Sequence, residues 1–362
     1  MKKFFIRLSY TLIPVWLLVV GMVIYLNVTD VSSEKSDINS GDLMRLGMIQ
    51  DSPGYSDSIR AAYELPEQYY ENQDNDSLLH LDTCDIVVVG DSYSHGGGIG
   101  QKGDYVNYLA HESGRRVVVF APDNIVGNPI QIAYELLNLN VIDSTNVKNL
   151  VVEEVERQLI SRHFSFVDNH TSLPRPKAKK QPSPTAEQGE KEKKKEKKKN
   201  FSPLLRVRDY VFYNLFDKNP VYFAKLSKPL FSVEYPTALY FYNEDVKSEH
   251  NFLIDKHKVI VDVYRQLIDK AREKGVNLVI VVACDKYDLY QDFIVDNHYP
   301  EKTINEDIAK WMADDLDCFV ITKQLLYPLV KQGKKDIFLY NDTHWSPVSS
   351  QIVVSEIIKK IK

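Results

Sequence analysis

The chain has 362 residues, of which 44% are hydrophobic and 11% aromatic, enough to build the core of one large domain or two modest ones. Its net charge of −5 is uneven: residues 172–200 hold eleven Lys or Arg and four Glu, a local charge of +7 that leaves −12 for the rest. A chain this acidic outside one tract is a poor nucleic-acid binder, which excludes that function class.

An uncharged segment near the N-terminus is the first predicted element. A basic flank at residues 2–7 precedes the run from Leu8 to Leu26, whose length of about 19 residues matches a bilayer crossing. The positive flank should stay cytoplasmic. Residues 1–27 are therefore predicted to anchor the protein as a single-pass transmembrane helix in the inner (cytoplasmic) membrane, with its C-terminal domain in the periplasm. A cleaved signal peptide is the alternative, although no small-x-small pattern follows Leu26.

Residues 28–80 are polar and are predicted to form a tether and a covering segment. A regular pattern follows and predicts the first part of an α/β domain at 81–165. Short apolar runs of this kind suit strands that are buried on both faces, as in a parallel sheet. The predicted strands are Ile86–Val89, Val117–Phe120 and Leu150–Val152, and the predicted helices are Tyr105–Glu112, ended by Gly114, and Pro129–Leu139.

An insertion is predicted at 166–250. Its stretch 173–200 is a low-complexity run of Lys, Glu and Pro, which lacks the apolar residues that would offset the entropy of ordering and should be disordered. A solvated loop is the favoured interpretation, and an electrostatic tether to anionic lipid or polysaccharide is the alternative. Residues 201–242 are rich in Phe, Tyr and Leu and are predicted to cap the domain.

The α/β pattern resumes at 251–362. Strands are predicted at Leu278–Ala283, Cys318–Ile321 and Ile337–Tyr340, and helices at Leu253–Lys274, Ile304–Leu316 and Thr322–Lys331, with a last helix that begins at Pro347 after the capping residue Ser346. Strands that alternate with helices indicate a parallel sheet covered on both faces. The fold class is therefore α/β, a three-layer α/β/α domain.

The strongest motif is Gly90-Asp91-Ser92-Tyr93-Ser94, directly after the first predicted strand. Open α/β sheets place their sites at the carboxyl ends of strands, and the helix that follows can aim its N–H groups at Ser92. The motif differs from the G-x-S-x-G elbow of the α/β-hydrolases. We interpret Ser92 as a nucleophile, with a helix-capping serine in a turn as the alternative.

The second motif is Asp342-Thr343-His344-Trp345, just before the last helix. A serine hydroxyl needs a base, and a histidine titrates near neutrality. A carboxylate two residues away can fix the tautomer of that histidine and stabilise its imidazolium. Because both motifs follow strands, the sequence predicts a catalytic triad of Ser92, His344 and Asp342.

Other residues near these motifs are candidates for binding. An acyl-transfer site needs oxyanion donors, and the candidates are the Ser92 N–H, the Gly127 N–H and the Asn128 side chain. Trp345 and Tyr93 are candidates for substrate binding, because sugar rings stack on aromatic faces; core packing of Trp345 is the alternative. The run Gly96-Gly97-Gly98 either lets a substrate approach the backbone or forms a flexible turn.

The sequence contains no feature that predicts a cofactor. It has no P-loop and no Cys/His cluster, so neither a nucleotide nor a metal is expected. Its three cysteines, Cys84, Cys284 and Cys318, lie in or beside apolar runs and are expected to be buried thiols. A single disulfide between two of them in an oxidising compartment is the alternative.

These motifs resemble the SGNH (GDSL-type) hydrolase superfamily, and specifically its alginate O-acetyltransferase-like branch. The Gly-Asp-Ser block opens the domain, and residues 342–345 match the Asp-Thr-His-Trp signature of that branch. Two weaker features agree: Val151-Val152-Glu153 through Arg157, and Asp285-Lys286-Tyr287 followed by Tyr290. The resemblance covers about 81–165 and 250–362. The Gly-x-Asn-Asp oxyanion element of the superfamily is absent, and the serine comes first here, whereas in the branch's best-known members Asp-x-His precedes it.

The resemblance implies Ser92, Asp342 and His344 as the triad and an O-acetyltransferase that acts on a cell-envelope or exported polysaccharide. It also implies a membrane-bound O-acyltransferase partner that presents the acetyl donor. An envelope carbohydrate esterase with the same triad is one alternative. A non-catalytic envelope scaffold is another, although the intact triad argues against it.

Overall fold

The computed structural model describes residues 10, 12–21, 41–45, 55–72, 84–120, 128–138, 146–166, 220–247 and 256–362. Within them a six-stranded sheet runs in the order β1-β3-β2-β4-β7-β8, and every neighbouring pair is parallel. The strands are β1 (Glu71–Asn72), β2 (Ile86–Val89), β3 (Val117–Phe120), β4 (Asn149–Val155), β7 (Asn277–Ala283) and β8 (Phe319–Ile321). The predicted parallel sheet is thus confirmed.

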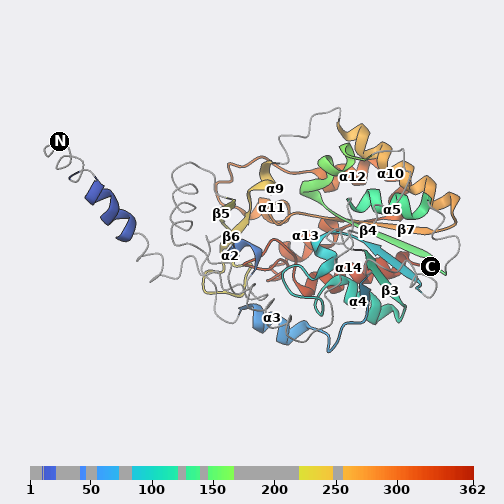
Figure 1. Cartoon of the computed structure of the whole chain (residues 1–362), viewed down its shortest axis with the longest axis horizontal. Coiled ribbons are helices and arrows are strands. Elements are labelled where there is room, and N and C mark those ends of the chain that lie inside the picture. The colour runs from blue at the N-terminus through green and yellow to red at the C-terminus, as the bar shows by residue number, and fades with distance from the viewer. Residues whose placement is uncertain are drawn as a thin grey trace, which may run out of the picture.

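Helices cover both faces of this sheet, because alternate residues of each strand point to opposite sides. One face carries α4 (Tyr105–Ser113), α13 (Thr322–Lys331) and α14 (Pro347–Lys360), whose apolar side chains share a core cluster with Ile86 and Val88. The other face carries α5 (Pro129–Asn138), α10 (Lys256–Glu273) and α12 (Ile304–Trp311), which pack with Val87 and Val89. Figure 1 shows α5, α10 and α12 above the sheet and α4 and α14 below it. The predicted three layers are present.

The order of the strands decides where a site can form. The chain passes from β2 to β3 on one side and then returns to β4 on the other side of β2. Ligands of open α/β sheets bind at such a reversal, outside the carboxyl ends of the strands. Ser92 follows the carboxyl end of β2, at this position.

Two predicted elements differ from the structure. Residues 337–340 form no strand; they make one isolated bridge, between Phe338 and Trp345, and the carbonyl oxygens of Leu339 and Tyr340 accept from the buried Lys286 ammonium instead of from a neighbouring strand. The helix predicted to run to Leu316 ends at Trp311 and continues as the 3-10 helix η7 (Ala313–Cys318).

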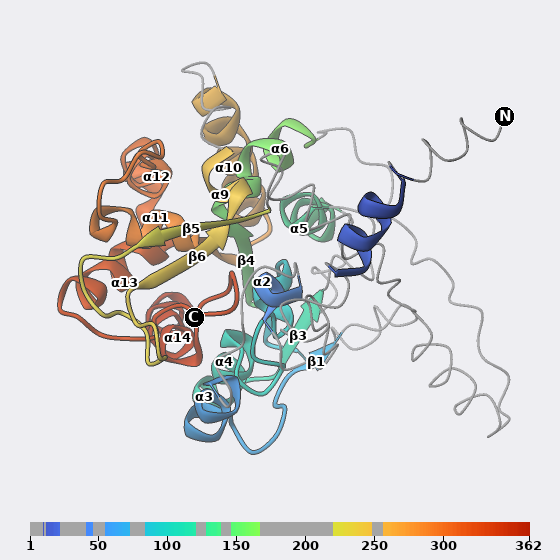
Figure 2. The same ribbon diagram turned by 90° about the vertical axis from the view of Figure 1, so that its left-hand side faces the viewer.

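The segment before the first predicted strand takes part in the fold. The short helix α2 (Asp42–Arg45) lies beside β6, α3 (Tyr55–Tyr63) contacts α14, and β1 adds an edge to the sheet next to β3. Figure 2 shows α2 in front of the sheet, close to β6. Leu43, Tyr55 and Ile59 belong to the main core cluster. Residues 41–45 and 55–72 therefore cover the domain closely.

The described part of the insertion forms a small antiparallel sheet of β5 (Val221–Lys225) and β6 (Ala238–Tyr242), followed by α9 (Asn243–Lys247). Leu239 and Phe241 are buried, and Phe241 contacts Tyr287 of α11 (Lys286–Tyr290). Residues 220–247 thus pack on the α/β domain. The low-complexity tract 173–200 and the stretch 201–219 lie outside the described residues.

The predicted N-terminal anchor is described only in part. Residues 12–21 are helical, and the large apolar side chains of Leu12, Trp16 and Leu18 are exposed. The flanks of the predicted span lie outside the described residues. Within the part of the chain that the structure describes, no helix has the length and apolar character needed to cross a membrane. The three cysteines are free; Cys84 and Cys284 are buried and Cys318 is partly exposed.

A buried group of charges joins the carboxyl ends of β4 and β7. The Lys302 ammonium lies 3.0 Å from Glu156 and 2.7 Å from Asp285, and all three side chains are inaccessible to solvent. Burial would lower the pKa of Lys302, but the two carboxylates hold it well above its usual value. The ammonium therefore compensates the buried Glu156 carboxylate, and it shares Asp285 with the Arg157 guanidinium, which lies 2.7 Å from that carboxylate.

Lys302→Met should destabilise the protein by about 3–5 kcal/mol, because removing one partner of a buried ion pair leaves the other uncompensated. Lys310→Met is the matched control, since Lys310 is 73% exposed and should change stability by about 0.5 kcal/mol or less. Denaturant unfolding of both variants measures the difference. Equal free energies of unfolding would contradict this assignment.

Candidate active site

Ser92 begins the 3-10 helix η2 (Ser92–His95). Asp91 caps this helix, since its side chain accepts from the Tyr93 N–H at 3.2 Å. The Asp91 carboxylate also pairs with Arg162 at 2.9 Å. Among these neighbours Ser92 is exposed, whereas Asp91, Tyr93 and Ser94 are buried. The turn therefore presents the Ser92 hydroxyl outward from an otherwise buried segment.

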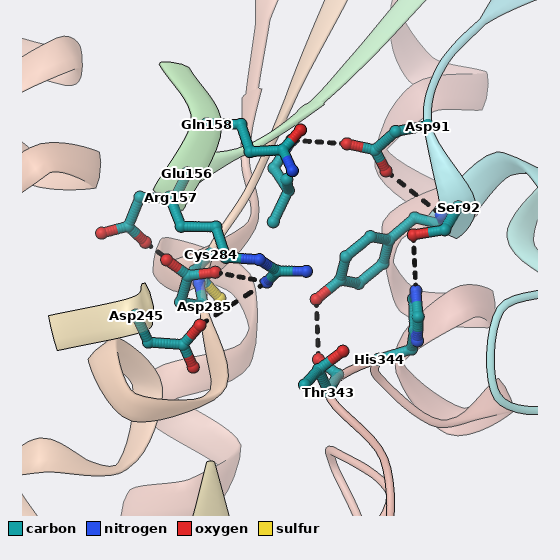
Figure 3. Close-up of polar contacts among 12 residues, drawn as sticks. Asp91, Ser92, Glu156, Arg157, Gln158, Asp245, Cys284, Asp285, Thr343 and His344 are labelled. Atoms are coloured by element: carbon teal, nitrogen blue, oxygen red, sulfur yellow. Dashed lines mark hydrogen bonds and ion pairs between the residues drawn. The ribbon is translucent and has the colours of Figure 1, made fainter. Parts of the chain in front are cut away.

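The structure brings together the three residues of the predicted triad. His344 Nε2 lies 2.7 Å from Ser92 Oγ, and the other ring nitrogen, Nδ1, makes a short hydrogen bond to Asp342 Oδ1. Figure 3 shows the imidazole of His344 directly beneath the Ser92 hydroxyl. Asp342 Oδ1 also accepts from the His344 N–H at 2.9 Å, which fixes the loop around the pair. This is the arrangement of a nucleophile, a base and a carboxylate that orients the base.

The charges around His344 favour its imidazolium form. Burial would lower its pKa, but the Asp342 carboxylate and its hydrogen bond raise it on balance, with a smaller contribution from Asp42. Burial would raise the pKa of Asp342, but the charge of His344 and its hydrogen bonds hold it below the usual value. The pair is thus arranged to accept a proton from Ser92 while Asp342 stays ionised.

Three buried side chains hold the loop that carries His344. The Lys286 ammonium donates to the carbonyl oxygens of Leu339, Tyr340 and Asp342 at 2.7, 2.9 and 3.1 Å. Burial lowers the pKa of Lys286 to about 7. The Tyr93 hydroxyl donates to the Thr343 carbonyl at 2.9 Å, and the Phe338 N–H donates to the Tyr290 hydroxyl at 3.2 Å. Lys286 and Tyr290, which belong to one of the weaker features of the family resemblance, therefore hold the catalytic loop in place.

The glycine run faces the triad. A Cβ on Gly97 would lie 2.4 Å from His344 Nε2, and one on Gly98, whose φ is +80°, would lie 2.9 Å from the Asp342 carboxyl carbon. Contacts under 3.0 Å are not seen for real Cβ atoms. The glycines therefore let His344 and Asp342 pack closely against the backbone of this run. This close packing accounts for the glycines, and no substrate is needed to explain them.

The two aromatic residues predicted to bind substrate are core residues, and this prediction is wrong. Trp345 is 3% exposed and Tyr93 is 2% exposed. The Tyr93 ring lies between His344, at 4.6 Å, and Trp345, at 4.5 Å between ring centroids. Tyr105 makes an edge contact with Trp345, at 6.1 Å between ring centroids. These rings support the base from within the core and offer no exposed face to a sugar.

Ser94 is excluded as the nucleophile. Its side chain is inaccessible, and its hydroxyl bonds to the Tyr105 hydroxyl at 2.8 Å and to Glu153 at 3.0 Å. Glu153 also accepts from the Asp91 N–H at 2.9 Å. The predicted motif at the end of the third strand thus braces the Ser92 turn from behind.

The three predicted oxyanion donors differ in whether the structure leaves them able to donate to a substrate. Within the described residues, no acceptor takes the Ser92 N–H. Gly127 lies outside the described residues. Asn128 does not fit the role, because its amide donates to the Arg162 carbonyl and the Ser165 hydroxyl, both at 3.1 Å, and its oxygen caps α5 at Gln131. Both ends of its side-chain amide are therefore engaged in structural hydrogen bonds.

Arg157 extends from the end of β4 toward the site. Its guanidinium bonds to Asp285 at 2.7 Å and lies 3.6 Å from Asp245. Figure 3 shows the guanidinium between Asp285 and the Ser92–His344 pair. Its charge lowers the pKa of His344, in opposition to Asp342.

Sequence reasoning did not identify Asp42, which contacts Asp342 and Thr343 from α2. No local pattern separates this aspartate from the other acids of residues 28–80. Among the described residues, one group of three potential metal ligands converges within 4.8 Å, namely Asp42, Asp342 and His344. The same atoms make the hydrogen bonds of the acid–base pair, so we assign the group to that pair.

Gly97→Ala should lower catalytic efficiency by about 100-fold. The added Cβ would push the His344 imidazole away from Ser92, and a displacement of a catalytic group by about 1 Å lowers the rate by about that factor. Gly114→Ala is the control: its φ of +63° strains an alanine, but nothing lies within 4 Å. The control should lose stability and keep its activity. Steady-state kinetics and melting curves of both variants test this, and full activity of Gly97→Ala would disprove the close approach.

Comparison with known proteins supports the resemblance over the C-terminal third of the chain. Residues 239–362 match the family described as SGNH hydrolase-like domain, acetyltransferase AlgX. A probable alginate O-acetylase AlgJ of Pseudomonas fluorescens is 30% identical over 123 residues, which cover 33% of this chain and 28% of that protein. No solved structure matches the chain. The matched residues include Asp342 and His344 but not Ser92, whose place rests on the geometry. Residues 239–362 are thus similar to the SGNH hydrolase-like domain of the AlgX acetyltransferase family.

Proposed function

We propose that the protein is a membrane-anchored, extracytoplasmic O-acetyltransferase that acetylates hydroxyls of a cell-envelope or exported polysaccharide through an acyl-serine intermediate. One observation carries this proposal: the exposed Ser92 hydroxyl lies 2.7 Å from His344 Nε2, and Asp342 holds the opposite ring nitrogen. An exposed serine oxygen so close to a buried, oriented imidazole is suited to attack a carbonyl carbon.

The first half-reaction acetylates Ser92. As its Oγ attacks the acetyl carbonyl, His344 Nε2 takes the hydroxyl proton, and Asp342 stabilises the imidazolium that forms. Negative charge develops on the carbonyl oxygen, where the Ser92 N–H can donate to it. The tetrahedral intermediate then collapses, the bond to the donor oxygen breaks, and His344 returns the proton to the departing alcohol.

The second half-reaction transfers the acetyl group. A sugar hydroxyl attacks the acyl-serine carbonyl and gives its proton to His344 Nε2. When the bond to Ser92 Oγ breaks, the imidazolium returns the proton to that oxygen. The free enzyme is restored, and His344 acts as base and then acid in each half.

The proposed acceptor and partner rest on the family. The relative with 30% identity is described as a probable alginate O-acetylase, which points to a polysaccharide acceptor. The match covers 28% of the length of that relative. A membrane-bound O-acyltransferase is the proposed donor partner. The exposed apolar side chains of residues 12–21 support a membrane anchor and thus an inner-membrane location.

An envelope carbohydrate esterase is the second candidate. It would use the same acyl-serine, and the exposure of Ser92 leaves that carbonyl open to water. The two functions differ in the acceptor of the second half-reaction.

The purified protein should hydrolyse an activated acetyl ester slowly, and adding an acceptor oligosaccharide should accelerate release of the alcohol and yield acetylated sugar. A transferase positions the sugar hydroxyl near the acyl carbon and gains from that proximity. Release of the alcohol and mass spectrometry of the sugar measure both reactions. If a broad oligosaccharide panel yields only free acetate at an unchanged rate, the esterase function replaces this proposal.

Two serine variants control that experiment. Ser92→Ala should lower catalytic efficiency by about 10⁴-fold or more with the fold intact, because the nucleophile is lost. Ser94→Ala removes a hydroxyl bonded to Tyr105 and Glu153, so it should lose stability and keep measurable turnover. The opposite pattern would mean that the nucleophile is misassigned.

A further inference from the structure

The segment at Gly41 and Asp42 lies directly on the catalytic loop, although it is 300 positions from Asp342. A Cβ on Gly41 would lie 2.0 Å from the Asn341 carbonyl oxygen, so only a glycine permits this approach. The Asp42 N–H donates to Asp342 Oδ2 at 2.8 Å. This bond occupies the carboxylate oxygen of Asp342 that His344 does not use.

The Asp42 side chain binds the residue between the two members of the acid–base pair. Its Oδ1 accepts from the Thr343 N–H at 2.8 Å, and its Oδ2 accepts a short hydrogen bond from the Thr343 hydroxyl. The opposite side of Thr343, its carbonyl, accepts from Tyr93. Thr343 is therefore held from both sides, and Asp42 supplies two of the three bonds.

The Asp42 carboxylate also acts on His344 through its charge. Its Oδ2 lies 3.8 Å from His344 Nδ1, and its side chain is 35% exposed. The other charges that bear on the imidazole are Asp342, which raises the pKa of His344, and Arg157, which lowers it. Partial burial and repulsion by Asp342 raise the pKa of Asp42 on balance, against His344 and Thr343.

An apolar contact also attaches α2 to the domain, in addition to these polar contacts. Leu43, the next residue, is fully buried in the main core cluster. The hydrogen bonds of Asp42 are directed at the catalytic loop, whereas Leu43 contacts the core.

We propose that Asp42 is a positioning residue of the acid–base system, a second carboxylate that orients Asp342 and Thr343 and favours the imidazolium of His344. The inference rests on the proposed acyl-transfer function. It extends the active site to the segment that follows the predicted N-terminal anchor, which the sequence alone assigns to a tether and a covering segment.

The test compares Asp42→Asn with Asp57→Asn, which makes the same charge change at an exposed position of α3. For Asp42→Asn, the acidic limb of the profile of kcat/KM against pH should move down by about 1 unit, because a carboxylate near 4 Å favours the charged form of His344. The plateau of kcat should fall by about tenfold through looser positioning. Asp57→Asn should leave both unchanged.

A second measurement does not require activity. In Ser92→Ala protein with labelled histidine, NMR follows the titration of His344 directly, and adding Asp42→Asn should lower its midpoint by a similar amount. If the proposed function is wrong, all variants lack activity while this arm still reports on Asp42. An NMR midpoint equal to that of the Asp57→Asn control overturns the inference.

Asp42→Glu guards against a folding defect. If Asp42→Asn melts far below Asp57→Asn, Asp42→Glu carries the test, since it retains the carboxylate. It should keep the His344 midpoint of the parent protein. A midpoint that falls with glutamate as well would show that the charge of Asp42 does not act on His344, and the inference would fail.

Discussion

The contact between Ser92 Oγ and His344 Nε2 is the constraint on which the rest of the structure depends. It joins two residues 252 positions apart, and neither residue can move far without losing it. The turn after β2 is braced by Glu153, and the loop before α14 is held by Lys286, Tyr93 and Asp42. Gly97 then leaves room for the imidazole between them. These buried residues therefore also hold the hydrogen bond between the serine and the histidine in place.

Buried charge is concentrated around this contact, and each charge has a specific partner. Lys286 faces three carbonyl oxygens, Lys302 faces two carboxylates, and Arg157 faces Asp285. A buried charge without such partners would be costly, so these positions tolerate few substitutions. The arrangement fixes the polarity of the site before any substrate binds, which is the condition for electrostatic catalysis.

Much of this architecture could be predicted from local sequence. The Val-rich runs of β2 and β3 and helix α13 lie where their patterns predict, and Ser92 follows β2, as catalytic residues of α/β folds commonly do. His344 lies in the loop before α14, although the strand predicted at residues 337–340 does not form. Other features depend on tertiary structure. The side chain of Trp345 could either stack on a sugar ring or pack in the core, and only its contacts with Tyr93 and Tyr105 show that it packs in the core. The role of Asp42 arises from a return of the chain over 300 positions, which no local pattern encodes.

Locating the acyl group on the protein identifies the nucleophile. The purified protein is mixed with an activated acetyl ester without a sugar acceptor, quenched in acid at short times and digested, and its peptides are analysed by mass spectrometry. If Ser92 is the nucleophile, one acetyl group accumulates on the peptide that contains Ser92, and specifically on that side chain. Turnover during which Ser92 stays unmodified at every time, or an acetyl group found on another residue instead, would contradict it.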